Sequence, residues 1–317
     1  MGDGAQPEGA PGVDLVLVPD NPPPDHAEII WYKGEGGIRL RLLFAPLENA
    51  RALAVVCPGR TESIEKYFEV CRVLQAKGFA IACFDWPGQG LSERPLKNPI
   101  RGHVTTFDTY VDALVRGLAE IADRAPKTRI IVAHSMGGAI SMEALRTGKV
   151  EAKLAAFSAP MWGIPVPPAL QAFARSVNAL GFGAFPARPE PKEEKFEGNP
   201  FSHDFHRWGL YRRLTTADPR LALGEPTIGW VVASLNVCEG FFKPGAVDRL
   251  AAMPMLVATA TEDTIVDPTA GGRLAARLPS ARHLPVQGAR HEIFMETDER
   301  RAFFWQAFDE LCVKAGV

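Results

Sequence analysis

The chain has 317 residues, of which 46% are hydrophobic and 23% are charged, so its composition excludes a disordered chain and favours a packed globular core. The formal net charge of −2 leaves no basic excess to neutralise phosphates, which argues against nucleic acid as a partner. No run of 18 apolar residues occurs, so a membrane-spanning helix is not expected.

The first 26 residues are rich in Pro, Gly and Asp and end in "DNPPPDH". Such a composition cannot bury a core, so we expect residues 1–26 to form a flexible arm. The arm lacks both the basic stretch and the apolar stretch of a secretory signal. After it, residues 28–34 and 38–45 are predicted to form two paired strands around a glycine-containing turn.

Short apolar runs then alternate with helical patterns along most of the chain. Continuous apolar strands separated by amphipathic helices are typical of a parallel sheet that is covered on both faces. The sequence therefore predicts a doubly wound α/β fold with a mostly parallel central sheet, whose core comprises residues 27–160 and 249–317. The predicted parallel strands are residues 52–57, 79–84, 129–133, 154–159, 255–260 and 281–286.

Residues 161–248 break this alternation. The segment holds several Pro, Phe and Trp residues and the charged stretch "RPEPKEEKFEG". A structureless loop of that length is improbable inside a compact domain, so we interpret it as an inserted helical cap. Its first part is markedly apolar over residues 159–186 and could line a slot for an acyl chain, contact a membrane surface, or simply pack on the sheet.

The stretch "IIVAHSMGGAI" places Ser135 between a predicted strand and a predicted helix. A serine held out on such a turn needs small residues two positions before and two after it, and these are Ala133 and Gly137. The pattern predicts a nucleophilic serine at the carboxyl end of the sheet. The alternative is an ordinary glycine-containing connection with an incidental serine.

Five stretches together resemble the α/β-hydrolases, and more narrowly their monoacylglycerol lipase and bacterial lysophospholipase branch. They are "VVCPGRTESIEKY", "FDWPGQGLSER", "AHSMGG", "TEDTIVD" and "GARHEIFME", and they extend over essentially the whole chain after the arm. Two positions depart from the family pattern. Ala133 replaces the usual first glycine of the serine turn, and Pro58 replaces the usual histidine before Gly59.

A serine nucleophile needs a base, and the base needs an orienting acid, which α/β-hydrolases supply in the order Ser, acid, His. His291 follows the last predicted strand and is the expected base. Asp263 follows the strand at 255–260 and matches the family position, whereas Asp267 precedes Pro268 and is expected to cap a helix. We therefore choose Asp263 as the acid. Asp85 also ends a strand, but is expected to brace the turn after it.

The other six histidines are expected to have no part in this chemistry. His26 lies in the arm, the ring of His134 should point away from Ser135, and His283 should pack against the sheet. His203 and His206 share a predicted helical face, but without a third ligand nearby a metal site is not favoured. His103 carries no further expectation.

The oxyanion of the tetrahedral intermediate needs preorganised donors. The backbone N–H groups of Met136, at the start of a helix, and of Arg60, after Gly59, are the expected pair. For the Arg60 side chain two readings stay open. It could meet an anionic head group, or it could form a salt bridge such as one with Glu62.

The resemblance implies hydrolysis of carboxylic esters of single-chain lipids through an acyl-enzyme, with neither a metal nor an organic cofactor. A short-chain carboxylesterase or thioesterase is the alternative, and a non-catalytic ligand-binding homologue is a third. The five cysteines are widely spaced, odd in number and contain no CxxC pair. They favour buried thiols in a reducing compartment, so we expect a cytoplasmic protein. Peripheral membrane contact through the apolar part of the cap is a separate expectation.

Overall fold

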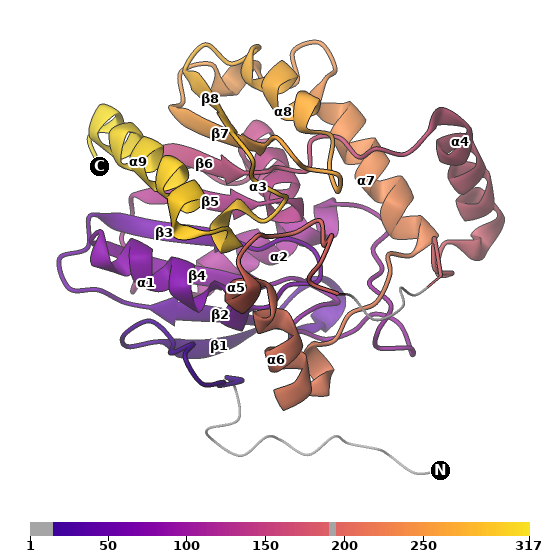
Figure 1. The fold of residues 1–317 in the computed structure, drawn as a ribbon, viewed down its shortest axis with the longest axis horizontal. Helices are drawn as coiled ribbons and strands as arrows, with labels where there is room; N and C mark the ends of the chain where they lie inside the picture. The colour runs from indigo at the N-terminus through magenta and orange to yellow at the C-terminus, as the bar shows by residue number, and fades with distance from the viewer. Residues whose placement is uncertain (1–14, 190–194) are drawn as a thin grey trace.

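A single eight-stranded sheet runs through the computed structural model, which describes residues 15–189 and 195–317 (Figure 1). The strands lie in the order β1-β2-β4-β3-β5-β6-β7-β8. β1 is antiparallel to β2 and β2 to β4, while every other neighbouring pair is parallel. The bounds are β1 Glu28–Lys33, β2 Arg39–Ala45, β3 Ala52–Cys57, β4 Phe79–Asp85, β5 Arg129–His134, β6 Leu154–Ser158, β7 Met255–Ala260 and β8 Ala281–Val286.

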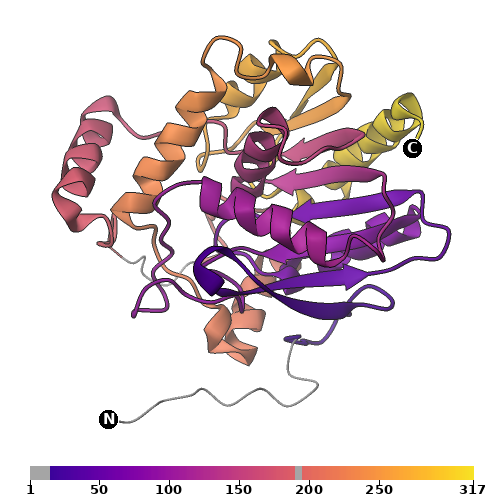
Figure 2. The ribbon, with the colours of Figure 1, turned by 180° about the vertical axis from the view of Figure 1, so that it is seen from behind.

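Helices cover both faces of this sheet (Figures 1 and 2). α1 (Phe68–Ala76) and α9 (Asp298–Ala315) pack on one face, and α2 (Asp108–Glu120), α3 (Met136–Arg146) and α8 (Pro268–Ala275) pack on the other. The prediction of a doubly wound, mostly parallel sheet is thereby confirmed. The predicted helix around Leu74 begins later than its pattern suggested, because residues Ile64–Tyr67 form a separate 3-10 turn.

The central strands are mostly apolar because both of their faces are buried. In β3, Leu53, Val55 and Cys57 face one core cluster, while Ala54 and Val56 face the other. Side chains of a strand alternate between its faces, so a strand covered on both sides has no position for a polar residue. All six residues of β3 are buried, and this is why the continuous apolar runs in the sequence located the strands so closely.

Part of the predicted arm is packed in the structure. Within the predicted arm of residues 1–26, Val16 and Asn21 are buried, and Asn21 Nδ2 donates to the Glu65 carbonyl at 2.8 Å. The Val16 N–H also donates to Glu65 Oε1 at 3.2 Å, so residues 15–26 pack against the core in spite of their proline-rich composition. His26 is exposed in this packed segment. The remainder of the predicted arm, residues 1–14, lies outside the described residues.

Between β6 and β7 the described chain is helical, as expected for a cap. It contains α4 (Pro168–Val177), α5 (Phe205–Trp208), α6 (Leu210–Ala217) and α7 (Ile228–Phe241). Figure 1 shows α4 on the outer side of α7 and α5–α6 at a separate place beside the sheet. We call residues 161–248 the cap, and their division from the core stays a prediction. Across the described ranges, no helix combines the length and the apolar character needed to cross a membrane.

Candidate active site

Ser135 occupies a sharp turn between β5, which ends at His134, and α3, which begins at Met136. Its φ of 49° and ψ of −118° are strained for a residue with a side chain, at a cost of about 1–3 kcal/mol. A Cβ on Gly137 would lie 2.0 Å from the Cys57 carbonyl oxygen, so only glycine fits there. The methyl group of Ala133 is fully buried in the core, which accommodates the departure from the family's usual glycine.

Three predicted residues meet at this turn. Ser135 Oγ lies 2.9 Å from His291 Nε2, and His291 Nδ1 lies 2.7 Å from Asp263 Oδ2. A carboxylate can only accept, so the proton of the imidazole is on Nδ1 and Nε2 is free to accept from the serine. Ser135 and His291 are both nearly buried, at 7% and 3% exposure, which removes competing water from these bonds.

Asp263 is held as a carboxylate by the donors around it. Its Oδ1 accepts the backbone N–H groups of Ile265 at 2.8 Å and Val266 at 3.1 Å. Burial alone would raise the pKa of Asp263, but the hydrogen bonds from His291 and from these two N–H groups outweigh it, so the pKa is lowered. The group that orients the imidazole is thus charged at neutral pH.

Asp267 has the structural position that its sequence context predicts. Its Oδ1 accepts the N–H of Thr269 at 2.9 Å as the N-cap of α8, and it accepts the Thr269 hydroxyl at 2.6 Å. Asp85 likewise braces a turn, because it accepts the N–H groups of Ile64 at 2.9 Å and Leu91 at 2.8 Å. The structure brings neither carboxylate to His291.

His134 is closer to the site than expected. Its Nδ1 bonds the Ser158 carbonyl at 3.0 Å, so the ring is directed toward the next strand and away from Ser135. The ring centre nevertheless lies only 4.8 Å from that of His291. Burial lowers the pKa of His134 to about 4, so a neutral ring packs beside the predicted base. His283, which was expected to pack against the sheet, is instead exposed on the edge strand β8 and bonds Thr259 Oγ1 at 2.9 Å.

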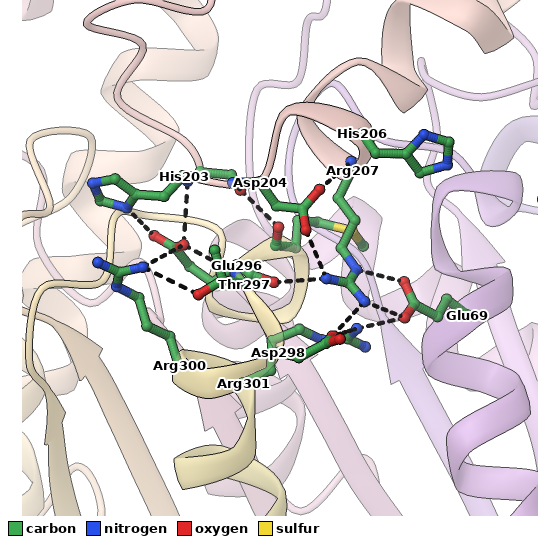
Figure 3. A network of polar contacts seen from close by, with 12 residues as sticks. Glu69, His203, Asp204, His206, Arg207, Glu296, Thr297, Asp298, Arg300 and Arg301 are labelled. Carbon is green, nitrogen blue, oxygen red and sulfur yellow. Dashed lines mark hydrogen bonds and ion pairs between the residues drawn. The ribbon is translucent and has the colours of Figure 1, made fainter.

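His203 and His206 do not share a helical face, which corrects the sequence interpretation. α5 begins only at Phe205, with Asp204 as its N-cap. Figure 3 shows the His203 ring at Glu296, whose Oε1 lies 2.8 Å from His203 Nδ1, while the His206 ring points to the opposite side. Within residues 15–189 and 195–317, no cluster of three or more His, Cys, Asp or Glu side chains has an arrangement that could hold a metal ion.

The turn of residues 58–61, which we call the 58–61 turn, lies directly against Ser135. A Cβ on Gly59 would be 3.2 Å from Ser135 Cβ. Glu62 accepts the Gly59 N–H, and Gln89 Nε2 donates to the Gly59 carbonyl at 2.8 Å. Thr61 adopts a φ of 64°, where glycine is usual. The turn is therefore fixed from several sides, with the Arg60 backbone between its anchors.

A buried polar network beneath this turn was not identified from the sequence. Glu62 bonds the Tyr67 hydroxyl at 2.6 Å and Lys66 Nζ at 2.9 Å, and Lys66 also reaches Glu292, the neighbour of His291, at 2.6 Å. Burial opposes the charge of Glu62, but Lys66 and further donors lower its pKa to about 2. The i,i+4 spacing of Glu62 and Lys66 was the feature of the sequence from which their ion pair could have been predicted. The network connects the 58–61 turn to the loop of the predicted base.

The cap also holds this loop. The Pro200 carbonyl accepts the His291 N–H at 3.2 Å, and the Phe201 carbonyl accepts the Glu292 N–H at 2.9 Å. Ser202 Oγ donates to the Met295 carbonyl at 2.7 Å. Two backbone bonds from the cap therefore fix the backbone on which the imidazole is mounted.

The sheet order, the strained serine turn and the Ser–His–Asp geometry define a serine hydrolase with the α/β-hydrolase fold. Residues 48–298 match the family model described as "Serine aminopeptidase, S33", and the chain belongs to that family. It is 33% identical to lysophospholipase L2 of Escherichia coli (strain K12), with 88% of this chain and 84% of the relative covered. It is 27% identical to the monoacylglycerol lipase of Mycolicibacterium smegmatis, with coverages of 85% and 91%.

A solved structure of similar fold is a soluble variant of the monoglyceride lipase of Saccharomyces cerevisiae in complex with a substrate analog. The TM-score is 0.70 at 20% sequence identity, over 90% of this chain and 94% of the other. At that identity the likeness shows the fold. The resemblance stated from the five sequence stretches is confirmed, because both the family match and the curated relatives fall within it.

Proposed function

We propose that this protein hydrolyses carboxylic esters of single-chain lipids, either lysophospholipids or monoacylglycerols, through an acyl-enzyme on Ser135. The observation that carries the proposal is the continuous hydrogen-bonded line from Ser135 through His291 to Asp263. The names of the relatives, a lysophospholipase and a monoacylglycerol lipase, support the class of substrate.

The reaction follows from the direction of these hydrogen bonds. Ser135 Oγ attacks the ester carbonyl carbon while His291 Nε2 takes the hydroxyl proton, and the carbonyl π electrons move onto the oxygen. The Asp263 carboxylate stabilises the resulting imidazolium. Collapse of the intermediate breaks the bond to the leaving alcohol, which receives the proton from His291. A water activated by the same nitrogen then releases the fatty acid and restores the serine.

Two backbone N–H groups are proposed to bind the oxyanion. Met136 is the first residue of α3, so its N–H has no acceptor within the helix and lies at the positive end of the helix dipole. The N–H of Arg60 belongs to the anchored 58–61 turn beside Ser135. Each such donor contributes about 2.7–4 kcal/mol of transition-state stabilisation in measured cases.

Chain-length dependence and a serine probe together test the proposal. Burial of an acyl chain yields about 0.8 kcal/mol per methylene, so rates on p-nitrophenyl esters from two to sixteen carbons should rise with length until the slot is full. A fluorophosphonate should label Ser135 quickly, which a non-catalytic binding protein would not show. A sharp maximum at two carbons, with no turnover of lysophosphatidylcholine or monoacylglycerol, would leave the short-chain esterase or thioesterase instead.

We also propose that the cap binds the surface of a membrane as a peripheral contact. Its outer part carries five large apolar side chains that are between 51% and 74% exposed, namely Leu170, Phe173, Leu180, Phe182 and Phe185. Isolated exposed apolar residues are ordinary, but five within sixteen positions favour a lipid-facing surface. A cytoplasmic location is part of the proposal, and the five buried free cysteines support it.

A further inference from the structure

The side chain of Arg60 extends from the 58–61 turn to the cap. Nη1 donates to Thr61 Oγ1 at 2.9 Å and Nη2 donates to the Gly224 carbonyl at 2.5 Å. The guanidinium carbon lies 5.3 Å from the centre of the Trp230 ring on α7. Both acceptors are uncharged, and Glu62 is engaged elsewhere, so the salt bridge with Glu62 considered from the sequence does not form.

One buried donor in this place makes no hydrogen bond. Arg60 Nε is buried and, among the residues that the structure describes, has no acceptor in hydrogen-bonding geometry, whereas the Trp230 indole N–H faces the Tyr110 hydroxyl. Guanidinium N–H groups can only donate, so the missing partner must be an acceptor. Buried polar groups are rarely left unpaired in folded proteins, and each exception calls for an explanation.

A second guanidinium in the same region, that of Arg94, has only backbone carbonyls as its hydrogen-bond acceptors among residues 15–189 and 195–317. Arg94 donates to the backbone carbonyls of Gly90 at 2.9 Å and Arg220 at 2.7 Å, and to that of Gly88. Tyr211 of α6 is close enough to both Arg60 and Arg94 for their charges to lower its pKa, against the larger effect of burial that raises it. Arg60 and Arg94 also bind the same stretch of the cap, because Arg60 donates to the Gly224 carbonyl and Arg94 to the Arg220 carbonyl.

The nearby carboxylates already have arginine partners. Glu225 forms an ion pair with Arg188, and Asp85 and Glu65 share Arg41. Tyr110 faces Arg60 as a neutral phenol, because burial raises its pKa. Burial lowers the pKa of Arg60 to about 10, so its guanidinium is still charged at neutral pH. Arg60 and Arg94 thus bring two guanidinium groups to this place, and Arg60 Nε lacks an acceptor, which is the chemistry that binds a phosphate.

We propose that Arg60 and Arg94 bind the phosphate of a substrate head group, so that lysophospholipids are preferred over monoacylglycerols. The inference rests on the proposed function, because the site lies one residue from the Gly59 backbone that touches Ser135. An ester held at the serine would have its glycerophosphate within reach of the Arg60 side chain. Arg60 then acts twice, with its backbone N–H on the oxyanion and its guanidinium on the head group.

The test compares two substrates that share one acyl chain, oleoyl-lysophosphatidylglycerol and monooleoylglycerol, in neutral detergent micelles. The readout is the ratio of their kcat/KM values, in which any loss common to both substrates cancels. Arg60→Gln and Arg94→Gln should each lower this ratio about tenfold, the size expected for a hydrogen bond to a charged group. Arg60→Lys keeps the charge and should retain part of the preference for the lysophospholipid. Arg116→Gln replaces an ion-paired surface arginine on α2 and should leave the ratio of the kcat/KM values unchanged.

The outcomes separate this inference from the proposed function. Turnover of monooleoylglycerol by the native protein without turnover of the lysophospholipid would overturn the inference alone, and turnover of neither would overturn the proposed function. An unaltered ratio in folded Arg60→Gln and Arg94→Gln would also overturn the inference. In a separate arm, glycerol 3-phosphate should inhibit hydrolysis of p-nitrophenyl butyrate more strongly than inorganic phosphate. Equal inhibition would point to free phosphate as the ligand instead of a head group.

Discussion

At the scale of single residues, two nearby aspartates have different roles because their neighbours in the sequence differ. Asp267 precedes Pro268 and caps α8, whereas Asp263 precedes a loop that turns its N–H groups onto the carboxylate. One becomes a structural acceptor and the other a partner for His291. The difference lies in local backbone geometry, which is why the sequence could distinguish them.

Substitution of Ser135, His291 and Asp263 tests their assignment as nucleophile, base and acid. Ser135→Ala and His291→Ala should each lower ester turnover by about four orders of magnitude or more, and the double variant should lose little further, because the residues act as a unit. Asp263→Asn should cost somewhat less. Asp267→Asn should change stability by less than about 1 kcal/mol, since Asn also caps helices well. Steady-state kinetics and urea unfolding would measure both effects.

The opposite pattern would reassign the acid. If Asp267→Asn abolished turnover while Asp263→Asn left it near the native value, the hydrogen bond at 2.7 Å between His291 and Asp263 would not be the productive one.

Side-chain direction was the part of the site that the sequence could not predict. The position of Arg60 next to Gly59 is evident from the motif, but the orientation of its guanidinium depends on Gly224 and Trp230, which are far away along the chain. Glu62 could equally have paired with Arg60 or Lys66 from spacing alone. Long-range packing decides such choices, and a single sequence carries no direct record of it.

At the scale of elements, α1, α5 and α9 are joined by charge. Arg207 of α5 contacts Glu69 of α1 through two hydrogen bonds at 2.8 and 2.9 Å, and Arg301 of α9 contacts the same carboxylate (Figure 3). Burial opposes ionisation of Glu69, but the two arginines outweigh it and lower its pKa to about 2. The Glu69 side chain of the core thus anchors α5 of the cap.

The depressed pKa gives this anchor a defined pH dependence. Because the folded-state pKa lies below the ordinary value of 4.5, the stabilisation is complete above about pH 4.5 and is lost as the pH falls toward 2. The free energy of unfolding of Glu69→Gln should therefore be lower than that of the native protein at pH 7, with the gap narrowing at pH 3. Urea titrations at pH 7 and pH 3 would measure this difference in the free energy of unfolding. Glu48→Gln, an exposed loop residue, should show no such narrowing.

Strands were easier to predict than the elements of the cap. The predicted strands 52–57, 255–260 and 281–286 agree with β3, β7 and β8 at both ends. For β3 and β7 the reason is that a sheet covered on both faces imposes an unbroken run of buried residues on each strand. In the cap, short helices such as α5 and α6 meet at Gly209 without a long periodic pattern. Their arrangement depends on ion pairs with the core, which periodicity does not show.

At the scale of the whole molecule, the exposed apolar surface of the cap lies on its outer part, around α4 (Figure 1). If this surface contacts lipid, Phe173→Glu combined with Leu180→Glu should reduce the fraction of protein that sediments with phosphatidylglycerol-containing vesicles by severalfold. Phe303→Glu, which alters a similarly exposed aromatic residue on α9, is the matched control. Equal sedimentation of all three proteins would exclude this surface as the membrane contact.

The two backbone bonds from Pro200 and Phe201 to the loop of His291 have a consequence for any attempt to re-engineer the enzyme. A lid that merely covered a complete site could be cut away or exchanged to obtain a more permissive catalyst. Here the cap also holds the backbone of His291, the predicted base. Removing or swapping residues 199–202 would thus disable proton transfer at the same time as it widened access. Residues 199–202 therefore support the backbone of the predicted base and cannot be exchanged independently of it.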